Sequence, residues 1–163
     1  MAAAEDGAPA RVVDAERADA VAIAALLTAS ITDLCEADHG HDPAVVASWT
    51  ANKTPQTVLK WIEDPELGVL AGWENGEIVS VGAFRVEGIM LTYVAPAHVR
   101  RGHGSALLAV MEACLGFAGV QNAHVTATRT ALGFYEACGY IADGPPDGGP
   151  GNWGQPMIKD LSA

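Results

Sequence analysis

Two arginines and two glycines stand together at positions 100–104, between an apolar run and a segment of helical periodicity. A strand, a glycine-containing turn and a helix start in this order can bind anionic phosphate. Backbone N–H groups at a helix start lack partners within the helix, and they converge with the positive end of the helix dipole. Glycine also lets a ligand come close to the backbone, because it has no Cβ. The spacing therefore predicts a phosphate-binding turn over residues 100–105.

The residues on either side of this turn predict the two elements that position it. Residues 89–94 form a continuous apolar run with β-branched and aromatic members, which is typical of a buried central strand. Beyond the turn, apolar residues recur at helical spacing, with Glu112 on the other side. They are Leu107, Val110, Met111, Cys114, Leu115 and Ala118. We expect Cys114 to lie in the core with the rest of this face.

Three phosphate-binding patterns can be compared with the turn. A P-loop requires a lysine after its last glycine, and none follows Gly104. A dinucleotide fingerprint would need a third glycine where Leu107 stands. The stretch VAPAHVRRGHGSALL resembles instead the acetyl-CoA motif of the GCN5-related N-acetyltransferase superfamily, V-x-P-x-x-[RQ]-x-x-G-x-[GA]. The matching residues are Val94, Pro96, Gly102 and Gly104. Val99 departs from the motif, because it stands at the usual arginine or glutamine.

A second motif follows at the expected distance, after another predicted strand. Residues 131–140, ALGFYEACGY, resemble the family element A-x-x-F-Y-x-x-x-G-[FY]. Thr128 stands seven residues before Tyr135, where the family often has asparagine. The terminal MIKDL also resembles the last strand of the family. The resemblance covers about residues 69–161, and the order of the two motifs makes it specific.

The resemblance implies roles for particular residues. In the family, the pantetheine arm of acetyl-CoA lies between the strands equivalent to 89–94 and 123–128, and the pyrophosphate sits on amides of the turn. The implied cofactor-binding residues are Tyr93, Val94, Arg100, Arg101, Gly102, His103, Gly104, Ser105 and Thr128. Tyr135 is the candidate general acid, because a phenol with a pKa of about 10 can give its proton to a departing thiolate. The alternative is that Tyr135 only packs in the core, with its hydroxyl bonded to the backbone.

The general base is left open. Many relatives carry a glutamate within the central strand, but residues 89–94 contain no carboxylate. The candidates are Glu87, Asp33, Glu36, Asp38, His39 and water. The spacing of His39, His41 and Asp42 is not diagnostic of a metal site, so we expect no metal.

Composition narrows the partners. The net charge of −11 and the pI near 4.6 argue against nucleic acid as the main partner and favour a small cationic amine, although solubility alone also explains an acidic surface. No segment has the length of a membrane span, so we expect no membrane partner. Three cysteines without a CxxC pair, and a start that does not resemble a secretion signal, predict a cytoplasmic protein. A homodimer is the common symmetric default.

The expected fold is a three-layer α/β/α sandwich around a mixed, mostly antiparallel sheet of about six or seven strands, the acyl-CoA N-acyltransferase fold. Asn75-Gly76 predicts a hairpin with a type I′ turn, and Asp42-Pro43 and Thr54-Pro55 predict helix starts. The expected strands are 11–13, 69–74, 77–85, 89–94, 123–128, 140–142 and 155–161. A flexible N-terminal tail over residues 1–10 is expected to precede a single domain over residues 11–163.

The sequence thus predicts an N-acetyltransferase that moves an acetyl group from acetyl-CoA to a primary amine. Direct transfer in a ternary complex is expected, because none of the three cysteines is placed as an acyl carrier. The alternative is a module of the same fold that binds an acyl-CoA as a sensor or structural ligand without turnover. A nucleotide-phosphate binder is a third and weaker interpretation.

Overall fold

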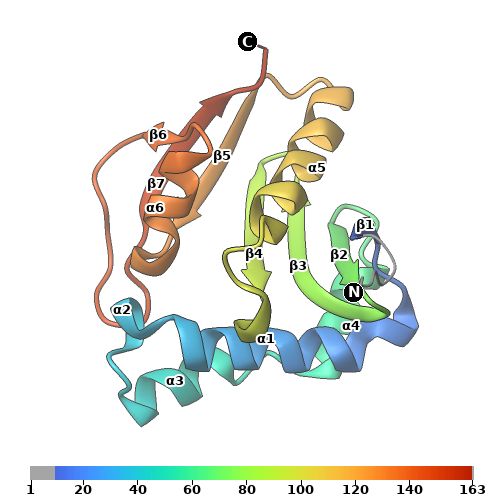
Figure 1. Ribbon diagram of the computed structural model, residues 1–163. Helices are drawn as coiled ribbons and strands as arrows, with labels where there is room; N and C mark the ends of the chain where they lie inside the picture. The colour runs from blue at the N-terminus through green and yellow to red at the C-terminus, as the bar shows by residue number, and fades with distance from the viewer. Residues whose placement is uncertain (1–9, 163) are drawn as a thin grey trace, which may run out of the picture.

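The computed structural model describes residues 10–162, and its centre is a seven-stranded sheet in the order β1-β2-β3-β4-β5-β7-β6 (Figure 1). The strands are β1 (Arg11–Asp14), β2 (Gly68–Glu74), β3 (Glu77–Arg85), β4 (Gly88–Val94), β5 (Asn122–Ala127), β6 (Ile141–Ala142) and β7 (Gln155–Asp160). Apart from Ala10, the expected tail over residues 1–10 lies outside the described residues.

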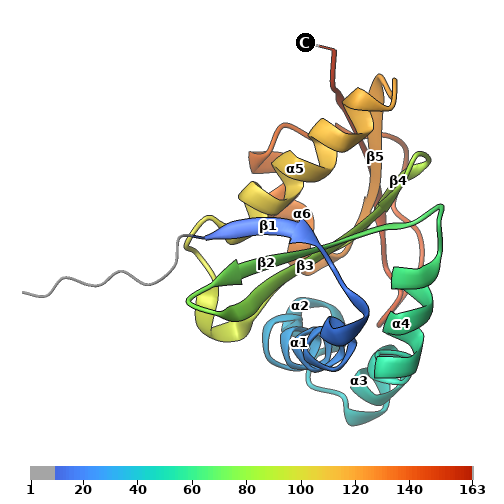
Figure 2. The ribbon, with the colours of Figure 1, turned by 90° about the vertical axis from the view of Figure 1, so that its right-hand side faces the viewer.

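Helices cover both faces of the sheet. They are α1 (Ala20–Leu34), α2 (Glu36–His39), α3 (Pro43–Thr50), α4 (Pro55–Glu63), α5 (His103–Phe117) and α6 (Arg129–Ala137), with short 3-10 turns η1 (Arg17–Asp19) and η2 (Pro96–His98). Figure 2 shows α5 and α6 on one face and α1, α3 and α4 on the other. The prediction of a three-layer sandwich is confirmed.

Local signals in the sequence set several element boundaries. The Asp42 carboxylate accepts a hydrogen bond from the N–H of Ala44, and the Thr54 hydroxyl accepts one from the N–H of Thr57, so both predicted helix starts are confirmed. Asn75 and Gly76 have φ values of 53° and 78°, as a type I′ turn requires. These short-range features follow from the chemistry of one or two residues.

Each face of the sheet has its own hydrophobic core. On one face, Leu107, Met111 and Leu115 of α5 pack with residues of β5 and α6. On the other face, Ile23 and Leu27 of α1 pack with residues of α4 and β3. Alternate residues of a strand point to opposite faces, so β4 contributes to both layers.

The sheet is antiparallel except between β4 and β5, which run parallel and share one registered pair, Ile89 with Val125. Beyond this pair the two strands diverge (Figure 1). The strand over residues 89–94 is central in the sheet as predicted, but it is not buried along its length: Ile89 is buried, Met90 is 57% exposed and the next four residues are half-buried. These five residues line a cavity.

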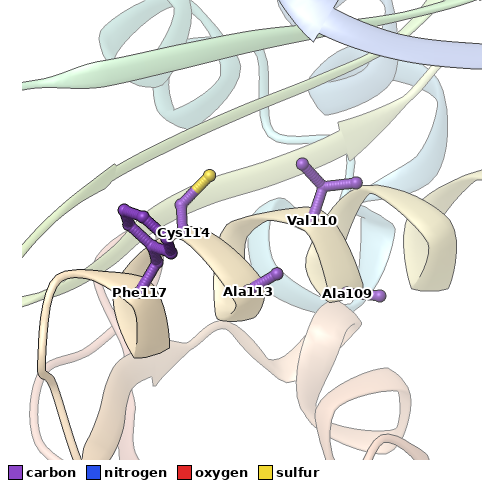
Figure 3. A pocket seen from close by; sticks show the side chains of 5 residues that line it. All are labelled: Ala109, Val110, Ala113, Cys114 and Phe117. Carbon is purple, nitrogen blue, oxygen red and sulfur yellow. The ribbon is translucent and has the colours of Figure 1, made fainter.

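The prediction that Cys114 lies in the core is wrong. Cys114 is exposed and belongs to an apolar patch on the outer flank of α5, together with Phe117, which is 98% exposed (Figure 3). The patch also includes Ala109, Val110 and Ala113. The buried stripe of α5 is narrower than its apolar stripe, so helical periodicity alone overestimated which residues pack on the sheet.

Two features are absent from the described residues, 10–162: a membrane-spanning helix and a cluster of metal-ligating side chains. None of their helices combines the length and the apolar character needed to cross a membrane. Within the same range, His, Cys, Asp and Glu side chains form no group of three or more that could hold a metal ion.

Candidate active site

A cavity of about 790 Å³ opens where β4 and β5 part. Its walls come from β4, the turn before α5, the start of α5, β5, α6 and the end of α1. The cavity therefore lies between the helices of one face and the end of a helix from the other face.

The turn before α5 has the backbone geometry of an anion site. Arg100 and Gly102 have positive φ values of 63° and 84°, which turn the chain sharply into the helix. The first hydrogen bond of the helix runs from the N–H of Ala106 to the carbonyl of Gly102. The N–H groups of His103, Gly104 and Ser105 therefore precede the helical ladder and are available to a ligand. The Ser105 hydroxyl donates to the Gly102 carbonyl at 3.2 Å, which closes the turn.

Gly104 is the point where three elements meet. A Cβ at this position would lie 3.0 Å from the ring of Phe134 in α6 and 3.6 Å from a methyl group of Val94 in β4. Glycine thus allows the start of α5 to approach both neighbours closely.

All but one of the predicted cofactor-binding residues line the cavity. They are Tyr93, Val94, Arg100, Gly102, His103, Gly104, Ser105 and Thr128. The exception is Arg101, whose side chain lies 3.4 Å from the carboxylate of Glu74 at the end of β2. The pair leaves Arg100 as the arginine of the turn that lines the cavity.

Glu74 also faces two histidines, His103 and His98, of which the sequence did not single out His98. Its carboxylate oxygens lie 3.4 Å from Nε2 of His103 and 3.7 Å from Nε2 of His98. Both histidines line the cavity. Glu74, at the end of β2, therefore contacts residues on both sides of the turn before α5. These residues lie too far from Glu74 in the sequence to form a motif with it.

Tyr135 reaches the cavity from α6 and is 3% exposed. Its hydroxyl donates a hydrogen bond to Oγ1 of Thr92 in β4, at 3.0 Å. The hydroxyl is therefore bonded to a side chain, and not to the backbone as the packing alternative expected. Its ring packs edge-on against Phe134 and Tyr140. Burial raises the pKa of Tyr135 to about 12, with the Thr92 hydroxyl acting in the opposite direction, so the phenol keeps its proton at neutral pH.

The structure places the five candidate base side chains away from the cavity lining. His39 is buried, with Nε2 2.8 Å from the Ile31 carbonyl oxygen and Nδ1 accepting the N–H of His41. Glu36 lies 3.2 Å from the His41 ring. Asp33 and Glu87 are exposed. Because none of these five side chains lines the cavity, water is the candidate base that is left from the sequence analysis.

Asp38 has a different partner. Its two carboxylate oxygens accept the N–H groups of Arg129 and Thr130, each at 2.9 Å, and the Thr130 hydroxyl donates at 2.6 Å. A carboxylate at a helix start satisfies free N–H groups and complements the dipole. Asp38 therefore joins α2 to the start of α6, which carries Tyr135.

Cys35 and Cys138 also line the cavity, which the sequence did not predict. Burial, together with the nearby Asp38 carboxylate, raises the pKa of the Cys35 thiol to about 11, with the Thr130 hydroxyl acting in the opposite direction. Burial also raises the pKa of Cys138 above its usual range. Both cysteines are therefore protonated at neutral pH, and a thiol is a much weaker nucleophile than a thiolate.

A sheet that opens between two parallel strands, with a glycine-containing turn at the opening, is the architecture of the acyl-CoA N-acyltransferase fold. A GCN5-related N-acetyltransferase from Rhodopseudomonas palustris is similar over 97% of this chain and 99% of its own, with a TM-score of 0.81 and 23% identity. The PaiA N-acetyltransferase from Thermoplasma acidophilum, solved with coenzyme A, is similar over 94% of this chain and 99% of its own, with a TM-score of 0.82 and 13% identity. YncA from Salmonella typhimurium, solved with acetyl-CoA, is similar over 94% of this chain and 95% of its own, with a TM-score of 0.72 and 20% identity.

The family follows from a separate comparison. The model of the acetyltransferase (GNAT) domain matches residues 36–161, so the chain belongs to the GCN5-related N-acetyltransferase family. The resemblance seen in the sequence is confirmed. A search of curated proteins found no match.

Replacing Gly104 by glutamate should abolish binding of acetyl-CoA. The new side chain would meet Phe134 and bring a negative charge to the free N–H groups of the turn. Isothermal titration with acetyl-CoA measures the effect, and circular dichroism checks the fold. Gly116→Glu is the matched control, because a Cβ at Gly116 in the same helix meets no atom within 4 Å. Equal affinity of both variants would contradict the placement of the cofactor.

Proposed function

We propose that this protein transfers an acetyl group from acetyl-CoA to a primary amine, by direct transfer in a ternary complex. The observation that carries the proposal is that one cavity is lined both by a turn with free N–H groups at a helix start and by a buried, protonated phenol. The first provides a place for the cofactor, and the second provides an acid for a leaving group.

The residues around the cavity fit coenzyme A. The free N–H groups of His103, Gly104 and Ser105, with the charge of Arg100 nearby, suit a pyrophosphate. The parted edges of β4 and β5 leave backbone groups near Tyr93 and Val94 for the pantetheine arm. Family members from Thermoplasma and Salmonella were solved with coenzyme A and acetyl-CoA, respectively. When bound, acetyl-CoA supplies an acetyl group activated as a thioester.

Tyr135 supplies the proton that the leaving thiolate needs. As the amine nitrogen bonds to the acyl carbon, the carbon–sulfur bond breaks and sulfur takes the proton of the Tyr135 hydroxyl. The surplus proton of the amine passes to water, and solvent returns a proton to Tyr135. The overall reaction converts an amine and acetyl-CoA into an acetamide and free coenzyme A, so atoms and charge balance.

A small cationic acceptor remains a prediction from the net charge of −11. The acidic residues after α1 that also favoured it have other places in the structure: Asp38 binds the start of α6, and Asp33 and Glu36 are exposed. The acceptor has to be identified by experiment.

We expect thiol release from acetyl-CoA in the presence of at least one member of an amine panel. The panel contains a polyamine, an aminoglycoside, an amino acid and a lysine peptide, and calorimetry measures acetyl-CoA binding in parallel. Binding without thiol release on any amine would support the sensor alternative. Failure to bind acetyl-CoA would contradict both the enzyme and the sensor.

Tyr135→Phe should lower turnover by about a hundredfold, because general acid catalysis contributes factors of this order. The affinity for acetyl-CoA should change by less than about twofold if the hydroxyl acts in the transition state. Turnover is measured by thiol release, and affinity by calorimetry. Unchanged turnover would mean that Tyr135 only packs in the core.

Direct transfer predicts that the Cys35→Ser, Cys138→Ser double variant keeps at least about half of the wild-type turnover, because neither thiol is an acyl carrier. Cys114→Ser is the control, since Cys114 lies on the outer flank of α5. Complete loss of turnover in the double variant, with intact folding and acetyl-CoA binding, would point to an acyl-cysteine intermediate.

A further inference from the structure

Thr92 occupies a defined place in the opened part of the sheet. It lies three residues beyond Ile89, the residue of β4 that pairs with β5, and therefore in the part of β4 that has no partner residue in β5. Its partner on β3 is Gly82. Directly paired residues of antiparallel strands point to the same face, and a Cβ at Gly82 would touch Met111 and Leu107 of α5. Thr92 therefore points toward the layer of α5 and α6.

The neighbours of Thr92 in β4 point the other way. Leu91 and Tyr93 pack with the core formed by α1 and α4. Thr92 is therefore the polar residue of β4 that faces α6, and the glycine opposite it leaves the space beside its hydroxyl free of a β3 side chain. The Thr92 hydroxyl accepts the hydrogen bond from the Tyr135 phenol, with 3.0 Å between the two oxygens.

The bond between Tyr135 and Thr92 crosses the parted strands. Tyr135 belongs to the α6 side of the cavity, and Thr92 belongs to β4. Both residues line the cavity, so the bond lies at its wall, within reach of a bound molecule. Within the described residues, Thr92 is the side-chain hydrogen-bond partner of the Tyr135 hydroxyl. The direction of the phenol O–H bond in the structure therefore depends on Thr92.

We propose that Thr92 is the positioning residue of the general acid: it orients the Tyr135 phenol and then stabilises the phenolate that forms when the proton leaves. The inference rests on the proposed function, because it assigns Thr92 a role through Tyr135.

The chemistry of a hydroxyl allows both tasks. A threonine hydroxyl is an acceptor through its lone pairs and a donor through its O–H. In the structure, Thr92 accepts the single O–H of the phenol. Before transfer, this O–H turns from Thr92 to the sulfur, and the Thr92 O–H turns to donate to the phenol oxygen. After the phenol gives its proton to sulfur, the buried phenolate needs a donor, because an unpaired buried charge is costly. Rotation of the Thr92 O–H supplies that donor without moving the backbone, and the proton that solvent returns to Tyr135 restores the first arrangement.

A double-mutant cycle tests this role. Thr92→Val removes the hydroxyl but keeps the branched shape, and Thr92→Ser keeps the hydroxyl. In the wild-type background, Thr92→Val should lower turnover about tenfold, the size expected for a hydrogen bond to a charged group, while the affinity for acetyl-CoA stays within about twofold. Thr92→Ser should restore turnover to within about threefold of the wild type. In the Tyr135→Phe background, Thr92→Val should change turnover by less than about twofold.

The cycle separates positioning from a structural role. A structural role in β4 would lower turnover by the same factor whether or not Tyr135 carries its hydroxyl. Equal factors in the two backgrounds, or failure of Thr92→Ser to restore turnover, would overturn the inference while the acetyltransferase proposal stands. If the wild-type protein binds acetyl-CoA but releases no thiol with any amine, the proposed function fails and the inference fails with it.

Discussion

The structure depends on the point where β4 and β5 stop pairing. These neighbouring strands run parallel and share the single pair Ile89 and Val125, so each leaves backbone groups and side chains uncovered beyond it. Buried backbone groups normally require partners, and an opened sheet is stable only where something else can satisfy or hydrate them. In this protein the opening is a cavity of about 790 Å³, and the elements with chemical groups are arranged around it.

Polar contacts hold together the elements that surround the opening between β4 and β5. Asp38 of α2 binds the free N–H groups at the start of α6, and Tyr135 of the same helix reaches Thr92 in β4. The helix that carries the candidate acid is thus fixed at its first turn and at its functional side chain. On the cofactor side, Glu74 supports the turn before α5 through Arg101. The links through Asp38 and Tyr135 use a helix end and a buried hydroxyl, where an unpaired partner would be costly, whereas the Arg101 side chain is 56% exposed.

Features that depend on neighbouring residues could be predicted from the sequence, and features that depend on distant residues could not. The turn at Gly102 and Gly104, the hairpin at Asn75-Gly76 and the helix starts were predictable, because each depends on a few adjacent residues with special backbone or capping properties. The exposure of Cys114 and Met90 was not, because an apolar stripe shows which residues could be buried and not which ones have a neighbour. Thr92 did leave a sign in the sequence, as a small polar residue within an apolar strand.

The sequence by itself determined the order of the elements, the glycine turn and the family, through two motifs whose residues lie close together in the chain. Only the tertiary structure decided which candidate residues meet. It brought Tyr135 to Thr92 across 43 positions and Asp38 to Thr130 across 92, and it kept the five candidate base side chains out of the cavity lining. The physical reason is that side-chain contacts depend on how strands part and helices pack, which no local pattern encodes.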